Sequence, residues 1–232
     1  MEIGAAIFFT DYSITPTKLA VALEERGFDS LWVAEHSHIP VSRRFSHPQG
    51  EAALTKEYFD VMDPFVTLSA AAAVTARLKL GTAVCLVIQR DTIQTAKLVA
   101  SLDQVSKGRF LLGIGCGWNA EEMEDHGTAY GTRTLKMREQ IEAMKQIWTK
   151  NVAEYHGQIV DFPPMNSPSR CRSRTHRSSS AAPSASPRGG RSATATGYYR
   201  QRRARVPVAQ KSSCRAGARW PKRPAGTRAR CR

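Results

Sequence analysis

Hydrophobic positions along the chain form short apolar runs that alternate with longer amphipathic segments. The runs of strand length cover residues 2–9, 30–34, 78–84 and 109–114. Each of them is short enough to be a buried strand. The segments between them begin with residues that cap a helix or favour its first turn, namely Thr15-Pro16, Asp63-Pro64 and Asp91. The pattern therefore predicts repeated strand and helix units, with Gly27 and Gly108 ending two of the helices.

The spacing of these strand runs indicates a parallel sheet. They begin 28, 48 and 31 residues apart, and two of the spacings match the roughly 30 residues of a strand, helix and strand unit. The wide interval places about twenty extra residues between Glu35 and Asp60, after the carboxyl end of the second strand. Parallel α/β proteins build their sites at this end of the strands. The long loop is therefore the first indication of a functional region.

The pattern continues to about residue 168 and then stops. A stripe of large apolar residues predicts a helix over 132–150, and residues 154–160 favour a small hairpin. Residues 1–168 carry 16 of the 34 Lys and Arg and all 20 Asp and Glu, a net charge of −4, which leaves +18 for residues 169–232. The basic segment has no Leu, Ile, Met or Phe. We therefore predict a folded α/β part, 1–168, followed by a disordered Arg-, Ala- and Ser-rich tail, 169–232.

Composition also excludes several classes of protein. The longest nearly uncharged apolar run, Phe65 to Ala76, is far shorter than the roughly 20 residues that span a bilayer. The start of the chain lacks the basic and apolar regions of a signal peptide. Its five cysteines show no C-x-x-C spacing. We expect a cytoplasmic protein with no membrane partner, no disulfide framework and no zinc ribbon.

A glycine cluster, Gly113-Ile-Gly-Cys-Gly-Trp118, follows the fourth strand run. It differs from a dinucleotide-binding fingerprint because Trp118 stands where the third glycine is required. Such a turn lets the backbone approach a ligand closely, and it is equally consistent with a tight turn that needs positive φ. The cluster alone does not identify a cofactor.

Histidines and charged residues flank this predicted edge of the sheet. His36 and His38 have the i, i+2 spacing that could chelate a metal, but no further ligand is evident, and a hydrogen-bonding role for His36 is favoured. The long loop carries basic residues that either contact an anion or are simply solvated, Arg43, Arg44 and His47. An acidic run is interpreted as favouring a helix N-terminus: Glu121, Glu122, Glu124 and Asp125.

Four segments have amino-acid sequences that are specific in combination. They are Glu24-Glu-Arg-Gly-Phe-Asp-Ser-Leu-Trp-Val-Ala-Glu-His36, Leu78-Lys-Leu-Gly-Thr-Ala-Val84, Leu102-Asp-Gln-Val-Ser-Lys-Gly-Arg-Phe110 and Gly113-Ile-Gly-Cys-Gly-Trp-Asn119. Together they resemble the luciferase-like monooxygenase family. The sequence of residues 35–40 and 122–126 is most similar to that of the subgroup that uses the deazaflavin coenzyme F-420. The resemblance covers residues 1–168 and none of the tail.

This resemblance implies a (β/α)8 TIM barrel, of which residues 1–168 would form the first four units as an open parallel sheet. It implies that the cofactor ring lies in the barrel mouth and that catalytic His36 donates a hydrogen bond near it, with Glu35 where some deazaflavin relatives have an acid. The family's third strand carries a non-prolyl cis peptide, matched at Ala83–Val84. The other implied cofactor contacts are Thr82, Gly115, Cys116 and Gly117. Trp118-Asn119 stands where some sugar dehydrogenases have a catalytic glutamate, so that role is not carried over.

The implied function is hydride transfer between F-420, or alternatively FMN, and a small organic substrate, in a possible homodimer. The sequence shows no pattern for strands five to eight of the barrel, so we expect impaired activity. We interpret the tail as an out-of-frame product of a frameshift near Ser167. Two other functions stay open. One is a metal-dependent hydrolase built on His36 and His38, and the other is a non-enzymatic protein that binds nucleic acid through its basic tail. The tail shows no specific nucleic-acid motif.

Overall fold

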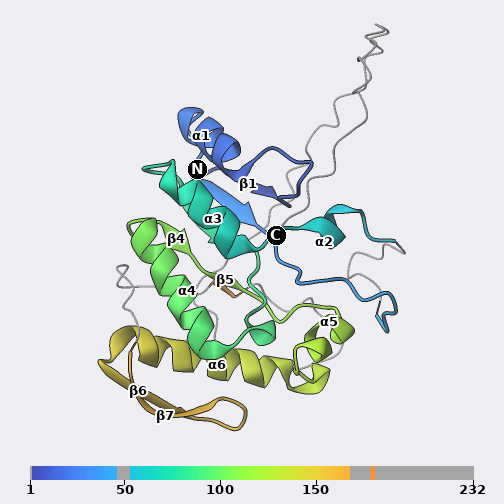
Figure 1. Cartoon of the computed structure of the whole chain (residues 1–232), viewed down its shortest axis with the longest axis vertical. Coiled ribbons are helices and arrows are strands. Elements are labelled where there is room, and N and C mark those ends of the chain that lie inside the picture. Colours follow the sequence, from blue (N-terminus) through green and yellow to red (C-terminus); the bar gives the residue numbers. More distant parts are fainter. Residues whose placement is uncertain (1, 46–52, 168–178, 181–232) are drawn as a thin grey trace, which may run out of the picture. The chain divides into compact units, whose positions relative to one another are not determined.

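A four-stranded parallel sheet organises the amino-terminal part of the chain (Figure 1). The computed structural model describes residues 2–45, 53–167 and 179–180. The strands are β1 (Gly4–Ile7), β2 (Ser30–Val33), β3 (Lys79–Thr82) and β4 (Phe110–Leu111). They are ordered β1-β2-β3-β4, so each strand pairs with the next one along the chain. The predicted α/β class with an open parallel sheet of four strands is confirmed.

Helices connect the strands where the capping residues predict them. They are α1 (Pro16–Glu25), α2 (Glu57–Asp60), α3 (Pro64–Ala73), α4 (Thr92–Val105), α5 (Ala120–Asp125) and α6 (Arg133–Thr149), with short 3-10 turns η1 (Val87–Gln89) and η2 (Tyr130–Thr132). The side chains of Thr15, Asp63 and Asp91 accept hydrogen bonds from the first turns of α1, α3 and α4. Gly27 and Gly108 follow α1 and α4 with φ of 76° and 85°. Local capping thus determines where these helices begin and end.

The helices α1, α3 and α4 pack in sequence against one another and cover one face of the sheet (Figure 1). Leu31 and Leu80 point into this layer and are fully buried with Leu68 of α3. On the other face, the indole of Trp32 lies over Gly81, where an added Cβ would stand 2.3 Å from indole Cε3. That close approach explains why residue 81 has no side chain.

The predicted fourth strand, residues 109–114, is divided into β4 and a separate β5 (Gly113–Ile114). The hydroxyl of Thr82 accepts the backbone N–H of Gly113 at 3.0 Å and donates to its carbonyl oxygen at 2.8 Å. A side chain therefore takes the place of a backbone partner for the Gly113 N–H, while the Gly113 carbonyl also accepts the backbone N–H of Cys85 at 2.7 Å. The expectation of one continuous strand is corrected for that reason.

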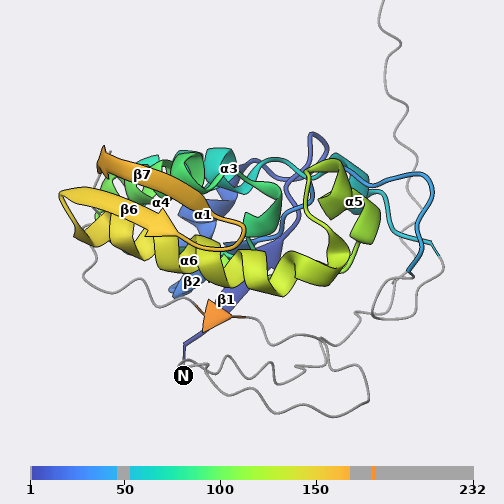
Figure 2. The same cartoon turned by 90° about the horizontal axis from the view of Figure 1, so that it is seen from below.

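A hairpin packs beside α6 (Figure 2). Its strands β6 (Val152–His156) and β7 (Asp161–Asn166) extend beyond the predicted 154–160. The Glu139 carboxylate of α6 accepts the N–H groups of residues 158–160, which line the turn. These bonds lower the pKa of Glu139 against the opposing effect of burial. The hairpin is thus held by a carboxylate as well as by its own ladder.

Beyond residue 168 the structure describes β8 (Ser179–Ser180), which pairs in parallel with β5. The expectation of no strand after residue 168 is corrected for these two residues, because backbone pairing needs no hydrophobic pattern. The remaining tail residues lie outside the described ones, as does the second of two units, Arg200–Arg232. Tail disorder and the boundary at 168 stay predictions. Of the helices in the described ranges, none is long and apolar enough to cross a membrane.

Candidate functional site

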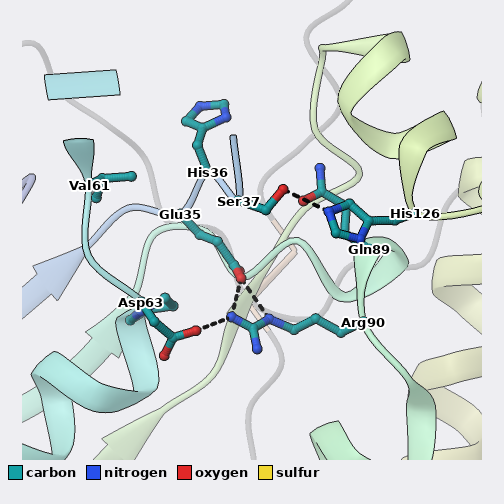
Figure 3. A pocket seen from close by; sticks show the side chains of 9 residues that line it. Glu35, His36, Ser37, Val61, Asp63, Gln89, Arg90 and His126 are labelled. Carbon is teal, nitrogen blue, oxygen red and sulfur yellow. Dashed lines mark hydrogen bonds and ion pairs between the residues drawn. The ribbon is translucent and has the colours of Figure 1, made fainter. Parts of the chain in front are cut away.

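After the carboxyl end of β2, the neighbouring side chains of Glu35 and His36 point in opposite directions. Figure 3 shows the Glu35 side chain directed toward Arg90 and the His36 ring directed away from it. Successive residues of an extended segment point to opposite sides. One strand end therefore supplies two separate groups of contacts.

Glu35 is 7% exposed and holds the loop that follows β3. Its Oε2 accepts the N–H of Leu86 at 2.7 Å, and its Oε1 accepts from Arg90 Nε at 2.6 Å. Arg90 also donates to Asp63 at 2.6 Å, the residue that caps α3 (Figure 3). Burial would lower the pKa of Arg90, but the charge of Glu35 and the bond to Asp63 outweigh it and raise that pKa. Both Glu35 oxygens are thus engaged within the protein, and its predicted contact with a cofactor stays a prediction.

His36 is held by a residue of α5. Its Nδ1 lies 2.9 Å from Oε2 of Glu122, and the two side chains are 9% and 1% exposed. The imidazole contacts two aromatic rings, with centroid distances of 5.4 Å to Tyr58 and 6.1 Å to Trp118. Because Nδ1 is occupied, Nε2 is the ring atom that can meet a ligand. An oriented, nearly buried imidazole at a strand end can hydrogen-bond or move a proton.

The segment after His36 is joined to α5 by further bonds. Ser37 Oγ lies 2.9 Å from Nδ1 of His38 and 2.8 Å from Nε2 of His126. His38 Nε2 lies 2.8 Å from Asp125. His36 and His38 thus pair with different acids instead of converging on one point. In the part of the chain that the structure describes, no three metal-ligating side chains form a cluster.

The acidic run is more than a favourable helix start. Arg44 donates from its backbone and its Nε to Glu121 at 2.9 and 2.7 Å, and its guanidinium also bonds Glu124. Glu121 and Glu122 lie in the first turn of α5, as the sequence interpretation has it. Acidic residues of this helix also neutralise Arg44 and hold the long loop, a contact that the sequence did not indicate. A contact of Arg43 with an anion stays a prediction, and His47 lies outside the described residues.

The strand ends beside His36 carry the backbone features implied for a cofactor support. The Ala83–Val84 peptide bond is cis. Gly115 faces it, and a Cβ there would stand 2.6 Å from Val84 Cγ2. Gly117 adopts a φ of 68°. These glycines are required by the close approach of two loops and by a left-handed turn.

Two other residues predicted to contact a cofactor, Thr82 and Cys116, are largely buried or already bonded within the protein. Thr82 is fully buried, and its hydroxyl is occupied by Gly113. Cys116 is half-buried with its Sγ 3.4 Å from Met137 Sδ, and burial raises the pKa of its thiol. Whether Thr82 and Cys116 touch a cofactor stays a prediction.

Asn119 was not identified from the sequence as a site residue. It is 2% exposed, yet both polar atoms of its side-chain amide lack a hydrogen-bond partner among the described residues. A buried amide without partners is costly unless something else satisfies it. Asn119 directly follows the glycine turn at the strand ends. The signal in the sequence was its place directly after Trp118.

A cavity of about 330 Å³ lies beside this edge, at the lower end of the volumes of small-molecule sites. Most of the residues that line it are polar or charged by type; the lining residues are Glu35, His36, Ser37, Val61, Asp63, Pro64, Gln89, Arg90 and His126 (Figure 3). The two groups of contacts from the end of β2 meet along it.

The chain belongs to the luciferase-like monooxygenase family, whose model matches residues 16–197. The resemblance drawn from the four sequence segments is thereby confirmed. The match continues past residue 168, so the expectation that it excludes the tail is corrected.

Among curated relatives, an uncharacterized protein of Mycobacterium tuberculosis is 45% identical over 166 residues, which cover 71% of this chain and 59% of the relative. An F-420-dependent glucose-6-phosphate dehydrogenase of Kineococcus radiotolerans is 30% identical over 153 residues, 63% of this chain and 41% of that protein. The chain thus spans less than two thirds of the length of these relatives.

Solved structures show the same fold. The monooxygenase RslO1 of Streptomyces bottropensis matches with a TM-score of 0.62 and 25% identity, over 75% of this chain and 51% of that one. The oxygenating constituent of 3,6-diketocamphane monooxygenase of Pseudomonas putida, in complex with FMN, matches with a TM-score of 0.56 and 22% identity, over 70% and 43%.

Proposed function

We propose that the chain is an oxidoreductase of luciferase-like type, which holds F-420 or FMN at the carboxyl ends of its strands and acts on a small organic substrate by hydride transfer. The observation that carries this proposal is the His36 imidazole, which is 9% exposed and oriented through Nδ1 by buried Glu122. Membership of the family supports the class of reaction. The F-420-dependent relative and the FMN-bound neighbour support the choice of cofactor.

The residues at the strand ends fit a bound ring in three ways. The unpartnered amide of Asn119 can hydrogen-bond polar ring atoms. The side-chain-free Gly115 and Gly117 allow backbone to approach. His36 can hydrogen-bond the reacting region through Nε2. When bound, the cofactor supplies the hydride chemistry, and the protein supplies binding and orientation.

We expect the activity of this chain to be low. The described residues supply the four-stranded main sheet and the short parallel pair β5-β8, whereas a complete barrel has eight strands. Among the described residues, nothing covers some of the sheet edges and faces that a full barrel would cover. The identity of the substrate, a homodimer and a cytoplasmic location stay predictions.

Titration of the purified full chain with F-420 and with FMN, followed by fluorescence, tests the proposal. We expect saturable binding of one of them, weakened about fivefold in His36→Gln because a hydrogen bond of about 1 kcal/mol is lost. His156→Gln is the matched control, since this exposed histidine pairs with Asp161 on the hairpin. Saturable binding of neither cofactor contradicts the proposal.

A further inference from the structure

Glu122 contacts two consecutive residues of the segment that follows β2. Its Oε2 lies 2.9 Å from Nδ1 of His36, and its Oε1 accepts the backbone N–H of Ser37 at 3.0 Å. The Glu122 side chain is 1% exposed, so water cannot easily replace either partner. The carboxylate thus has a different donor on each oxygen.

Donor and acceptor counting then determines where the His36 proton lies. A carboxylate offers only acceptors, and a neutral imidazole carries one N–H and one bare nitrogen. A hydrogen bond between Nδ1 and the carboxylate requires the proton on Nδ1. We infer that Glu122 is a positioning residue that fixes neutral His36 as its Nδ1–H tautomer and so presents Nε2 as a hydrogen-bond acceptor. Under this inference His36 accepts a hydrogen bond through Nε2, whereas the resemblance implies that it donates one. The effect on a ligand rests on the proposed function, whereas the tautomer itself does not.

The Ser37 N–H makes a specific substitution informative. In Glu122→Gln the side chain keeps its shape but has one acceptor and one donor end. The Ser37 N–H needs an acceptor, so the amide oxygen is expected to replace Oε1. The amide NH2 then faces Nδ1 of His36 and can bond it only if Nδ1 is bare. The substitution is therefore expected to move the ring proton to Nε2.

Long-range ¹H–¹⁵N spectra of the full chain, labelled with ¹⁵N-histidine, test the inference because they show which ring nitrogen carries the proton. The His36 signals are assigned from their loss in His36→Gln. The spectra are followed upward in pH until the ring has lost one proton. We expect the remaining proton on Nδ1 in the natural chain and on Nε2 in Glu122→Gln. Glu124→Gln is the matched control on the same helix, where the carboxylate bonds Arg44, and it should leave the tautomer unchanged.

Either of two results overturns the inference. One is a neutral His36 in the natural chain with its proton on Nε2. The other is a folded Glu122→Gln chain that keeps the proton on Nδ1. If Glu122→Gln does not fold, the spectrum of the natural chain still decides the question. Absence of cofactor binding would contradict the proposed function and leave the tautomer result intact, so the two failures are distinguishable.

Discussion

Glutamate carboxylates join separate elements at both ends of the parallel strands. We call these ends the amino edge, where the strands begin, and the carboxyl edge, where they end. The groups that donate hydrogen bonds to the carboxylates differ between the two edges. At the amino edge, Glu24 at the end of α1 accepts the backbone N–H groups of residues 76–78, which lead into β3. Backbone amides do not titrate and cannot turn toward a ligand. Glu24 therefore serves to hold a connection in place.

At the carboxyl edge, Glu35 and Glu122 each combine one backbone N–H with side-chain partners, which for Glu122 include the Ser37 hydroxyl at 3.5 Å. Glu35 combines Leu86 N–H with Arg90, and Glu122 combines Ser37 N–H with His36. The side-chain donors carry charge or can move a proton. The comparison shows that similar carboxylates accept only backbone amides at one edge and combine backbone amides with charged or imidazole side chains at the other, which is the edge where barrels place their sites.

The largest effect is expected at the carboxyl edge from Arg90→Met. This change leaves Glu35, which is 7% exposed, as a buried charge without its partner. Breaking a buried ion pair by removing one partner costs about 3–5 kcal/mol. Urea unfolding followed by circular dichroism measures the loss in free energy of unfolding.

Arg44→Met is the matched control for Arg90→Met. Arg44 also pairs with two acids, but its side chain is 54% exposed, so the expected loss is about 1 kcal/mol or less. Equal losses in the two variants would show that burial of Glu35 does not distinguish the carboxyl edge.

An intermediate effect is expected at the amino edge from Glu24→Ala. Loss of the acceptor for residues 76–78 should cost about 1–2 kcal/mol at pH 7. Burial alone would raise the pKa of Glu24, but the bonds from Arg77, Leu78 and Ala76 outweigh it and lower that pKa. A lowered pKa stabilises the fold above the unfolded value of 4.5, and this contribution is lost as pH falls through the folded pKa.

Unfolding curves at pH 7 and at successive values below 4.5 measure this dependence. The difference between the natural chain and Glu24→Ala should shrink on acidification. Glu25→Ala, at the exposed neighbouring glutamate, should show little difference at either pH. A gap for Glu24→Ala that widens in acid would contradict the assignment.

The smallest effect is expected from His38→Gln at the exposed part of the carboxyl edge. The side chains of His38 and Asp125 are 40% and 61% exposed. The free energy of unfolding, measured from urea unfolding curves, should therefore change by about 0.5 kcal/mol or less. A loss comparable with that of Arg90→Met would show that stability at this edge does not depend on burial.

Local signals in the sequence predicted much of the fold. The caps Thr15, Asp63 and Asp91 and the stops Gly27 and Gly108 act within a few residues of themselves. Each of these signals needs only its own turn of chain, so it can be interpreted without knowing the fold. The order of strands and helices followed from them and from hydrophobic spacing.

The site was only partly predictable for the opposite reason. The resemblance led to His36 and to the Ala83–Val84 peptide, but the acidic run was interpreted as a helix start. Glu122 lies 86 residues from His36 in the sequence, and no local pattern records that they meet. The unpartnered amide of Asn119 likewise becomes visible only when its surroundings are known.

The sequence by itself determined the alternation of strands and helices, the position of the long loop and the change of composition after residue 168. The tertiary structure alone decided that Thr82 divides the fourth strand, that Glu35 turns to Arg90 and that Glu122 orients His36. Periodicity and capping are properties of neighbouring residues. Hydrogen bonds between distant polar groups depend on how the elements pack, and packing is determined by the whole chain.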